Sequence, residues 1–302
     1  MSSIAYVTDA KMLEFHRLCR HRTILFWRLS SKRRITDFRK GDLLFFYSKP
    51  VHGRKKGLIG YAHYDSTKRL SLKQMWKQYG EKTGYGTEEV MRDTIQKAAK
   101  ASKVEVPAQM RCLYLTDVVF FLTPVYPDQV GIEIPSNLES YTYLDKDDPK
   151  ITVKILERAR KHGIDLWSAD PDVSPDEIFR NDVTRHQLAV IHNEIGKESG
   201  TQKEKSISRH LAKERIQTKN WEMIRGSGTD CLSMDKNRVI IAVPFVSQAN
   251  DRDLRVREFI GRICIYKMMT EKYGFERKVK FEVMCEKPAE DVMEMVETIN
   301  HE

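Results

Sequence analysis

The apolar residues of this chain occur in short runs, and the length of these runs limits the folds that it can adopt. The longest, such as residues 43–47 and 118–123, have the length of single β-strands. No run approaches the roughly 18 apolar residues that a membrane-spanning helix requires. With 302 residues, 40% of them apolar, the chain is long enough for two globular domains with separate cores. The first residues, Met1-Ser2-Ser3, lack the pattern of a secretory signal, so we expect a soluble, cytoplasmic protein.

The positive charge of the chain is concentrated towards its N-terminus. The whole sequence carries a net charge of +9, whereas residues 11–82 alone contain 19 Lys and Arg against 5 Asp and Glu. The remainder of the chain is therefore net negative. A localised basic excess indicates a surface that binds a polyanion. The sequence thus predicts a nucleic-acid partner, with DNA favoured over RNA and no membrane partner, and it leaves a homodimer open.

The spacing of apolar residues predicts a mixed α+β protein in two parts. In the first part we expect strands at 23–29, 43–48, 58–65, 111–123 and 141–144, and helices at 12–21, 72–79, 88–101 and 151–162. A polar, Pro-bearing stretch at 168–175 marks a boundary, which gives domains at 1–170 and 180–302. In the second part we expect a helix at 182–196, a hairpin at 231–233 and 238–245, a helix at 255–273, a strand at 279–285 and a helix at 290–299.

The first part resembles a known superfamily in the order of its motifs. A strand and a basic loop are followed by KGDLLFFY at 40–47, a Gly-bearing turn, KGLIGYAHY at 56–64 and RCLYLTDVVFFLTPV at 111–125. This order resembles the PUA superfamily, in particular its EVE and ASCH branches, over about residues 20–145. The resemblance implies a small β-barrel with helices that binds RNA or DNA. It also implies a pocket with aromatic walls, in which several members hold a modified or flipped base.

Stacking on aromatic faces and pairing with phosphates are the interactions that such a domain requires. Each stacked base contributes about 1–3 kcal/mol, and Lys and Arg bind the phosphates. For every aromatic candidate the alternative is core packing, and for every basic candidate it is a solvated loop. The stacking candidates are Trp27, Tyr47, Tyr61 and Trp76, the phosphate candidates are Arg33, Arg34, Arg54, Lys55 and Lys56, and Ser30 is a candidate for contact with a base edge.

The second part resembles a nuclease superfamily in the order of its elements. Asp230 follows Gly226-Ser227-Gly228-Thr229 and precedes a predicted hairpin. A helix with Glu194, the hairpin with Asp230, the helix GRICIYKMMTEKYG at 261–274 and a further strand are similar to the PD-(D/E)XK superfamily over about residues 182–286. The resemblance implies an α/β domain in which Asp230 and Glu194 hold Mg²⁺, which activates water, while a Lys supports charge on the phosphate.

The sequence departs from that nuclease pattern at one strand. An acid-x-Lys motif would fall within residues 239–245, where the chain has Ala242 and Pro244. Either the active site has been lost, or Glu258 and Gln248 act as substitutes. Other chemistry has little support, because the chain lacks GxxxxGK[ST], GxSxG and HExxH motifs. Its five cysteines form no CxxC pair, so we expect buried thiols rather than a structural zinc site.

Three hypotheses follow from these patterns. The first is a DNA or modified-base reader fused to a restriction-type nuclease domain, and the second is a non-catalytic binding protein whose second domain dimerises or adds contacts. The third is a basic module for a small molecule or a protein partner. A second carboxylate within about 5 Å of Asp230 would favour the nuclease, because the two would share a metal. Steep salt dependence of nucleic-acid binding would exclude the third hypothesis.

Overall fold

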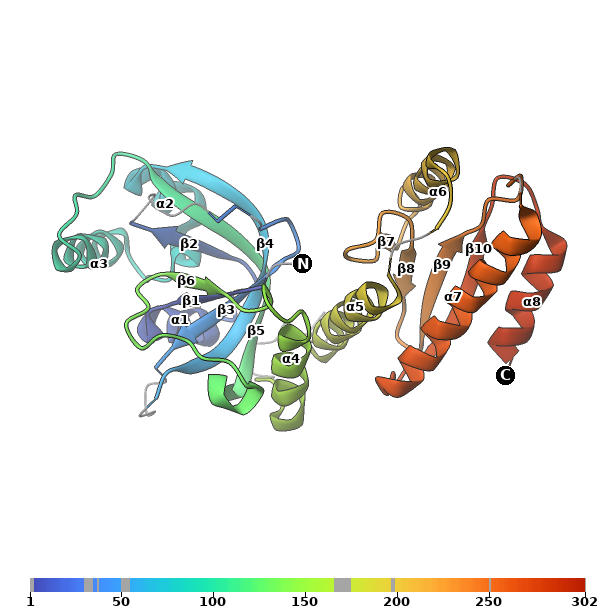
Figure 1. Ribbon diagram of the computed structural model, residues 1–302. Coiled ribbons are helices and arrows are strands. Elements are labelled where there is room, and N and C mark those ends of the chain that lie inside the picture. Colours follow the sequence, from blue (N-terminus) through green and yellow to red (C-terminus); the bar gives the residue numbers. More distant parts are fainter. Residues whose placement is uncertain are drawn as a thin grey trace. The chain divides into compact units, whose positions relative to one another are not determined.

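The computed structural model describes residues 3–29, 35–36, 38–49, 55–165, 175–196, 199–249 and 251–301. The chain divides into two compact units, Met1–Phe179 and Arg180–Glu302. The fold is mixed, with both strands and helices in each unit (Figure 1). Among the described residues no helix is long and apolar enough to span a membrane.

The first unit is built on one six-stranded sheet with the order β2-β5-β4-β3-β1-β6. Neighbouring strands are antiparallel except β1 and β3, which are parallel. The strands are β1 (Ile4–Val7), β2 (Ile24–Arg28), β3 (Leu43–Ser48), β4 (Gly57–Leu70), β5 (Met110–Val125) and β6 (Tyr141–Tyr143). The helices are α1 (Ala10–Leu18), α2 (Leu72–Tyr79), η1 (Gly80–Thr83), α3 (Glu88–Ala101), η2 (Pro127–Val130) and α4 (Lys150–His162).

The sheet is curled, so that its two ends approach each other. Strands β4 and β5 are long and curved (Figure 1), and their pairing contains several bulges. A bulge bends its strand and increases the local twist, which allows a sheet to curl. The Tyr6 ring of β1 meets the Phe26 ring of β2 edge to face at 4.8 Å, and Arg28 of β2 lies over the ring of Tyr141 in β6. The first unit is therefore barrel-like.

Two apolar clusters lie on opposite faces of this curled sheet. Inside the curl, Ile4, Phe26, Leu44 and Leu113 are buried with Tyr6. Leu25 and Cys112, which alternate with these residues along β2 and β5, pack on the outer face with residues of α2 and α3, such as Met75 and Met91. This alternation is the pattern expected of a sheet that is covered on both faces.

The second unit has a four-stranded sheet with the order β10-β9-β8-β7. Strands β7 (Trp221–Met223), β8 (Cys231–Met234) and β9 (Arg238–Pro244) form an antiparallel meander. Helix α7 (Arg252–Lys272) then returns the chain to β10 (Lys278–Met284), which pairs with β9 in parallel. Parallel neighbours require such a crossover. The remaining helices are α5 (Pro175–Ile195), α6 (Gln202–Arg215) and α8 (Glu290–His301).

Several element boundaries differ from the sequence prediction. Strand β4 extends to Leu70, five residues beyond the predicted end, because the polar residues after Asp65 continue to pair with β5. The short strands β1 and β7 were not predicted. Helix α5 begins at Pro175, so the division between the units falls inside a helix. Proline is favoured at the first position of a helix, where its missing N–H is not needed.

Candidate nucleic-acid interface

Three arginines stand opposite one another on adjacent strands of the first unit. Arg111 of β5 pairs with Arg28 of β2 on one side and with Arg69 of β4 on the other. Residues directly opposite each other project from the same face of a sheet, with Cβ atoms about 4.5–5.5 Å apart. We call Arg28, Arg69 and Arg111 the arginine row. Phe26 and Leu113 lie two residues from Arg28 and Arg111 on β2 and β5, so they project from the same face of the sheet. Because Phe26 and Leu113 are buried inside the curl, the row also faces the inside.

The three members of the arginine row differ in burial. Arg28 is 5% exposed, donates from Nε to the Tyr6 hydroxyl at 2.9 Å and lies over the rings of Tyr6 and Tyr141. Arg111 is half-buried and Arg69 is exposed. Within the part of the chain that the structure describes, no acidic side chain forms an ion pair with Arg69 or Arg111. Like charges directly opposite each other are unfavourable, so the row is suited to an anion.

A basic hollow follows the row along the chain. Arg69 precedes the last residue of β4, and Ser71 then begins α2 with a capping box to Gln74. Lys73 and Lys77, four residues apart on one face of α2, line an open hollow of about 530 Å³ with Ser71, Gln74, Ala108 and Gln109. Arg69, Lys73 and Lys77 thus follow one another within nine residues, at the end of β4 and on α2.

The four predicted stacking aromatics do not form one pocket. Tyr61 is fully buried against Phe45, Phe121 and Phe179, with ring centroids 5.6–6.3 Å away. Tyr47 is 5% exposed. The prediction that these two tyrosines stack on bases is corrected, because neither presents a free face.

Trp27 and Trp76 lie together on the outer face of the sheet. Both are half-buried and pack in the cluster with α2 and α3, and Trp27 Nε1 donates to the Tyr85 hydroxyl at 3.2 Å. Burial raises the pKa of Tyr85 to about 12. Because this face is the one opposite to the arginine row, the two tryptophans and the row belong to different surfaces.

The predicted phosphate contacts in the loops are only partly described. Lys55 is exposed and paired with Asp128 at 2.9 Å, and Lys56 lies over the Tyr47 ring. The other candidates, Ser30, Arg33, Arg34 and Arg54, lie outside the described residues.

In the second unit, Asp230 is the centre of a buried ionic cluster. It is 0% exposed, and its Oδ2 accepts hydrogen bonds from Arg262 Nη2 and from the Tyr266 hydroxyl, both at 2.6 Å. His192 Nδ1 lies 3.3 Å from the same oxygen, and Thr229 Oγ1 donates to Oδ1. Burial raises the pKa of Asp230. The hydrogen bond with His192, the charge of Arg262 and the bond from Tyr266 outweigh it, so the pKa is lowered.

The other predicted nuclease residues lie apart from this cluster. Glu194 is exposed on α5, two residues and therefore about 200° around the helix from His192, which faces Asp230. Glu258 is exposed and accepts hydrogen bonds from Ser199 and Arg255, each at 2.6 Å. The Gln248 side chain is also exposed, and its backbone N–H donates to Glu286.

Strand β9 shows why the acid-x-Lys positions cannot complete a metal site. Ala242 packs with Ala212 and Cys231 on one face of the sheet, whereas Tyr266, the partner of Asp230, belongs to the core on the other face. Val243 and Phe245 share that second core and are apolar. Both oxygens of Asp230 already accept hydrogen bonds, so these residues do not fit Mg²⁺, and we derive no catalytic step from them.

The arginine row has no clear signature in the sequence. Arg28 and Arg111 lie within predicted strands, but the predicted third strand ended at 65 and left Arg69 outside. The sequence shows only that each of these strands has an arginine near one of its two ends. Only the register, which includes the bulges of β4, aligns them.

Comparisons with known proteins relate about half of the chain to solved structures. No family model matches the sequence, and no curated protein matches it. The crystal structure of ASCH from Zymomonas mobilis aligns with 17% identity and a TM-score of 0.34, covering 51% of this chain and 94% of that one. A point mutant of the same protein aligns with 17% identity and a TM-score of 0.36, covering 52% and 98%. Both of these solved structures are of an ASCH protein, and the similarity spans about half of this chain.

Proposed function

We propose that the first unit binds nucleic acid and that the accessible members of the arginine row, Arg69 and Arg111, contact its phosphates. The observation that carries this proposal is the alignment of Arg28, Arg111 and Arg69 on adjacent strands, with no acid paired to Arg69 or Arg111 among the described residues. Cross-strand pairs of like charge destabilise a sheet by up to about 1 kcal/mol. A bound phosphate offsets this repulsion, whereas a neutral partner does not.

Arg28 fixes the buried end of the row. It is 5% exposed and its guanidinium is held by the Tyr6 hydroxyl and by two aromatic rings, so it adds positive charge to the row rather than a direct contact. A guanidinium fork can form two parallel hydrogen bonds to a phosphate. Arg111 and Arg69 extend the row towards solvent.

The burial of the predicted stacking residues favours recognition of the backbone over recognition of bases. Tyr61 and Tyr47 are in the core, so the cations provide the main contacts. Contacts to phosphates position a protein on nucleic acid but carry no sequence information. We therefore expect binding that depends steeply on salt and tolerates changes of sequence. Duplex DNA is the first ligand to test, and reading of a modified base through Trp27 and Trp76 stays a prediction.

The test is fluorescence anisotropy with the full chain and labelled DNA duplexes of two unrelated sequences, together with matched RNA, at several salt concentrations. The test variant is Arg69→Gln/Arg111→Gln. We expect the variant to bind more weakly and to lower the slope of log K against log salt by about 0.9 for each phosphate of duplex DNA that it no longer neutralises. The two sequences should bind equally well.

A charge-matched control separates the row from net charge. Arg238 and Arg252 are already paired with Asp235 and Asp291, at 2.7 and 2.6 Å. Arg238→Gln/Arg252→Gln removes the same two charges and should leave the salt slope unchanged. A flat salt response of the wild-type chain, or equally weakened binding in both double variants, would contradict the proposal.

A further inference from the structure

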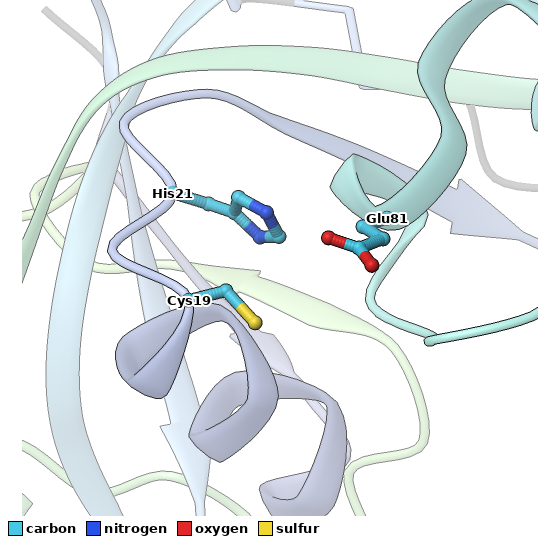
Figure 2. Close-up of side chains that lie close together, drawn as sticks. All are labelled: Cys19, His21 and Glu81. Atoms are coloured by element: carbon cyan, nitrogen blue, oxygen red, sulfur yellow. The ribbon is translucent and has the colours of Figure 1, made fainter.

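Three potential metal ligands meet at the end of α1 and the start of η1. Cys19 Sγ, a ring nitrogen of His21 and a carboxylate oxygen of Glu81 all lie within 4.8 Å of one another. Figure 2 shows the three side chains pointing towards a common point, two from the turn after α1 and one from η1. Among the described residues, this is the one group of three such donors that lie so close together.

Backbone hydrogen bonds define the turn that carries Cys19 and His21. The N–H of Arg20 donates to the Arg17 carbonyl, the N–H of His21 donates to the His16 carbonyl, and Arg20 has a φ of 53°. This is the Schellman pattern, which ends a helix with one left-handed residue. A non-glycine residue in that conformation is uncommon, so the turn is held by its surroundings. The two potential ligands flank the left-handed residue.

The third potential ligand is also held by a short turn. Glu81 lies in η1, directly after α2, where the N–H of Gly84 donates to the Glu81 carbonyl and Thr83 Oγ1 donates to the Gly80 carbonyl. Cys19 and Glu81 are exposed and His21 is half-buried. The backbone positions are therefore fixed, while the side chains are accessible to an ion from solution.

A second histidine orients the ring of His21. His16 Nδ1 and His21 Nδ1 are 2.9 Å apart, and His16 is fully buried. The two Nδ1 atoms share one proton in this hydrogen bond. The other ring nitrogen of His21, Nε2, can then bind a different partner. Metal-binding histidines typically use the second ring nitrogen for a hydrogen bond of this kind, which fixes the ring and its tautomer.

We propose that Cys19, His21 and Glu81 form a three-ligand site for a Zn²⁺ ion with a fourth position open to water. Thiolate, imidazole and carboxylate are the three usual zinc ligands. Bond lengths of about 2.0–2.3 Å in a tetrahedron place ligand atoms about 3.3–3.6 Å apart. The ligand atoms lie within 4.8 Å of one another, so binding would require the exposed Cys19 and Glu81 side chains to rotate slightly towards His21.

The charge and softness of the donors select the ion. A thiolate and a carboxylate together match a divalent charge. Mg²⁺ and Ca²⁺ prefer sites made of oxygen ligands, whereas Cys and His favour zinc and other late transition metals. The absence of a CxxC pair therefore does not exclude zinc here, because the ligands come from two separate elements.

The experiment is competition for Zn²⁺ between the reduced full-length protein and a chromogenic chelator. We expect one Zn²⁺ per chain with high affinity and a rise in Tm with zinc. Co²⁺ should give the thiolate-to-cobalt absorption of a cysteine-ligated site. Cys19→Ser, His21→Gln and Glu81→Gln should each weaken binding, and Cys19→Ser should abolish that absorption.

Two further variants serve as a control for the cysteine and as a test of the contact between the two histidines. Cys264→Ser removes another exposed cysteine, in the second unit, and should leave zinc affinity unchanged. His16→Phe keeps the buried volume but removes the ring contact, and should weaken binding by about 10–100-fold, as is typical of groups that orient a ligand. Unchanged zinc affinity in the folded Cys19→Ser variant, or loss of binding in Cys264→Ser, would overturn the proposal.

Discussion

The carboxylate of Asp230 shows how one side chain can appear catalytic in sequence and structural in the fold. It lies after a Gly-rich turn and before a hairpin, where a metal ligand is expected. In the structure it is fully buried and accepts hydrogen bonds from Arg262, Tyr266 and Thr229. Such an anion holds α7 to the start of β8, and its removal takes the carboxylate away from the guanidinium of Arg262, which is only 11% exposed.

The first prediction concerns the substitution Asp230→Asn. Breaking a buried ion pair by removing one partner typically costs about 3–5 kcal/mol, because the other charge stays buried. We expect a loss of that size in the free energy of unfolding of the second unit, measured by urea denaturation. Asp235→Asn is the matched control, since the Asp235–Arg238 pair is exposed, and it should change stability by less than about 1 kcal/mol.

The second prediction concerns the acid dependence of the same residue. The pKa of Asp230 is lower in the folded protein than its ordinary value of 3.8. The unfolded chain therefore takes up this proton at higher pH than the folded protein, and stability falls as the medium is acidified. The stability difference between wild type and Asp230→Asn should be constant at neutral pH and should shrink below about pH 4. A difference that grows in acid would contradict this assignment.

At the scale of elements, the arginine row exists because of how three strands pair. None of the three arginines is unusual by itself in sequence. The bulges of β4 shift its register against β5, and this shift places Arg69 opposite Arg111. A one-residue difference in register would turn a side chain to the opposite face of the sheet. The row is therefore a property of the sheet.

The third prediction is that repulsion between the like charges of the row lowers the free energy of unfolding of the free protein. Arg69→Thr removes a like-charge pair and adds a β-branched residue, so we expect a gain of about 0.2–1 kcal/mol in the free energy of unfolding. Nucleic-acid affinity should fall in the same variant. The gain should shrink at high salt, because salt screens exposed charges.

A strand cation outside the row is the control for this experiment. Lys280 of β10 lies opposite Ile240, so Lys280→Thr removes no cross-strand repulsion. It should show no salt-dependent gain in urea denaturation. If Arg69→Thr behaves in the same way as Lys280→Thr, the repulsion within the row is negligible and the argument for an anion there fails.

At the scale of the whole molecule, the two units differ in charge as well as in core. Residues 1–179 carry a net charge of +7 and residues 180–302 carry +2. Each unit has its own buried clusters, around Ile4 and around Leu25 in the first, and around Ile241 and around Ala242 in the second. Substitutions in one core should therefore act mainly within that unit.

The fourth prediction tests this independence. Amide hydrogen exchange of the full chain, followed by mass spectrometry, should show faster exchange over residues 199–301 in Asp230→Asn. The protection of residues 3–165 should stay unchanged, because no cluster of the first unit includes Asp230 or its partners. Equal loss of protection in both units would show that the chain unfolds as one cooperative body.

Much of the secondary structure could be predicted from the sequence, because local patterns determine it. The helical stripe of Phe259, Ile263 and Tyr266 is buried in α7 as its spacing indicates. The Ser71 capping box begins α2 at the predicted residue. The predicted boundaries of β4 and α5 were wrong. Pairing with β5 extends β4 through polar residues, and α5 begins earlier than predicted, at a proline in a polar stretch.

The sequence by itself determined the mixed class, the short strands, the division into two parts and the concentration of positive charge, because these follow from composition and local periodicity. Only the tertiary structure decided which residues meet. It buried Tyr61, paired Asp230 with Arg262, aligned Arg28, Arg111 and Arg69, and brought Cys19 and His21 to Glu81. Sites of this kind depend on register and on contacts between residues far apart in the chain, and neither has a local signature.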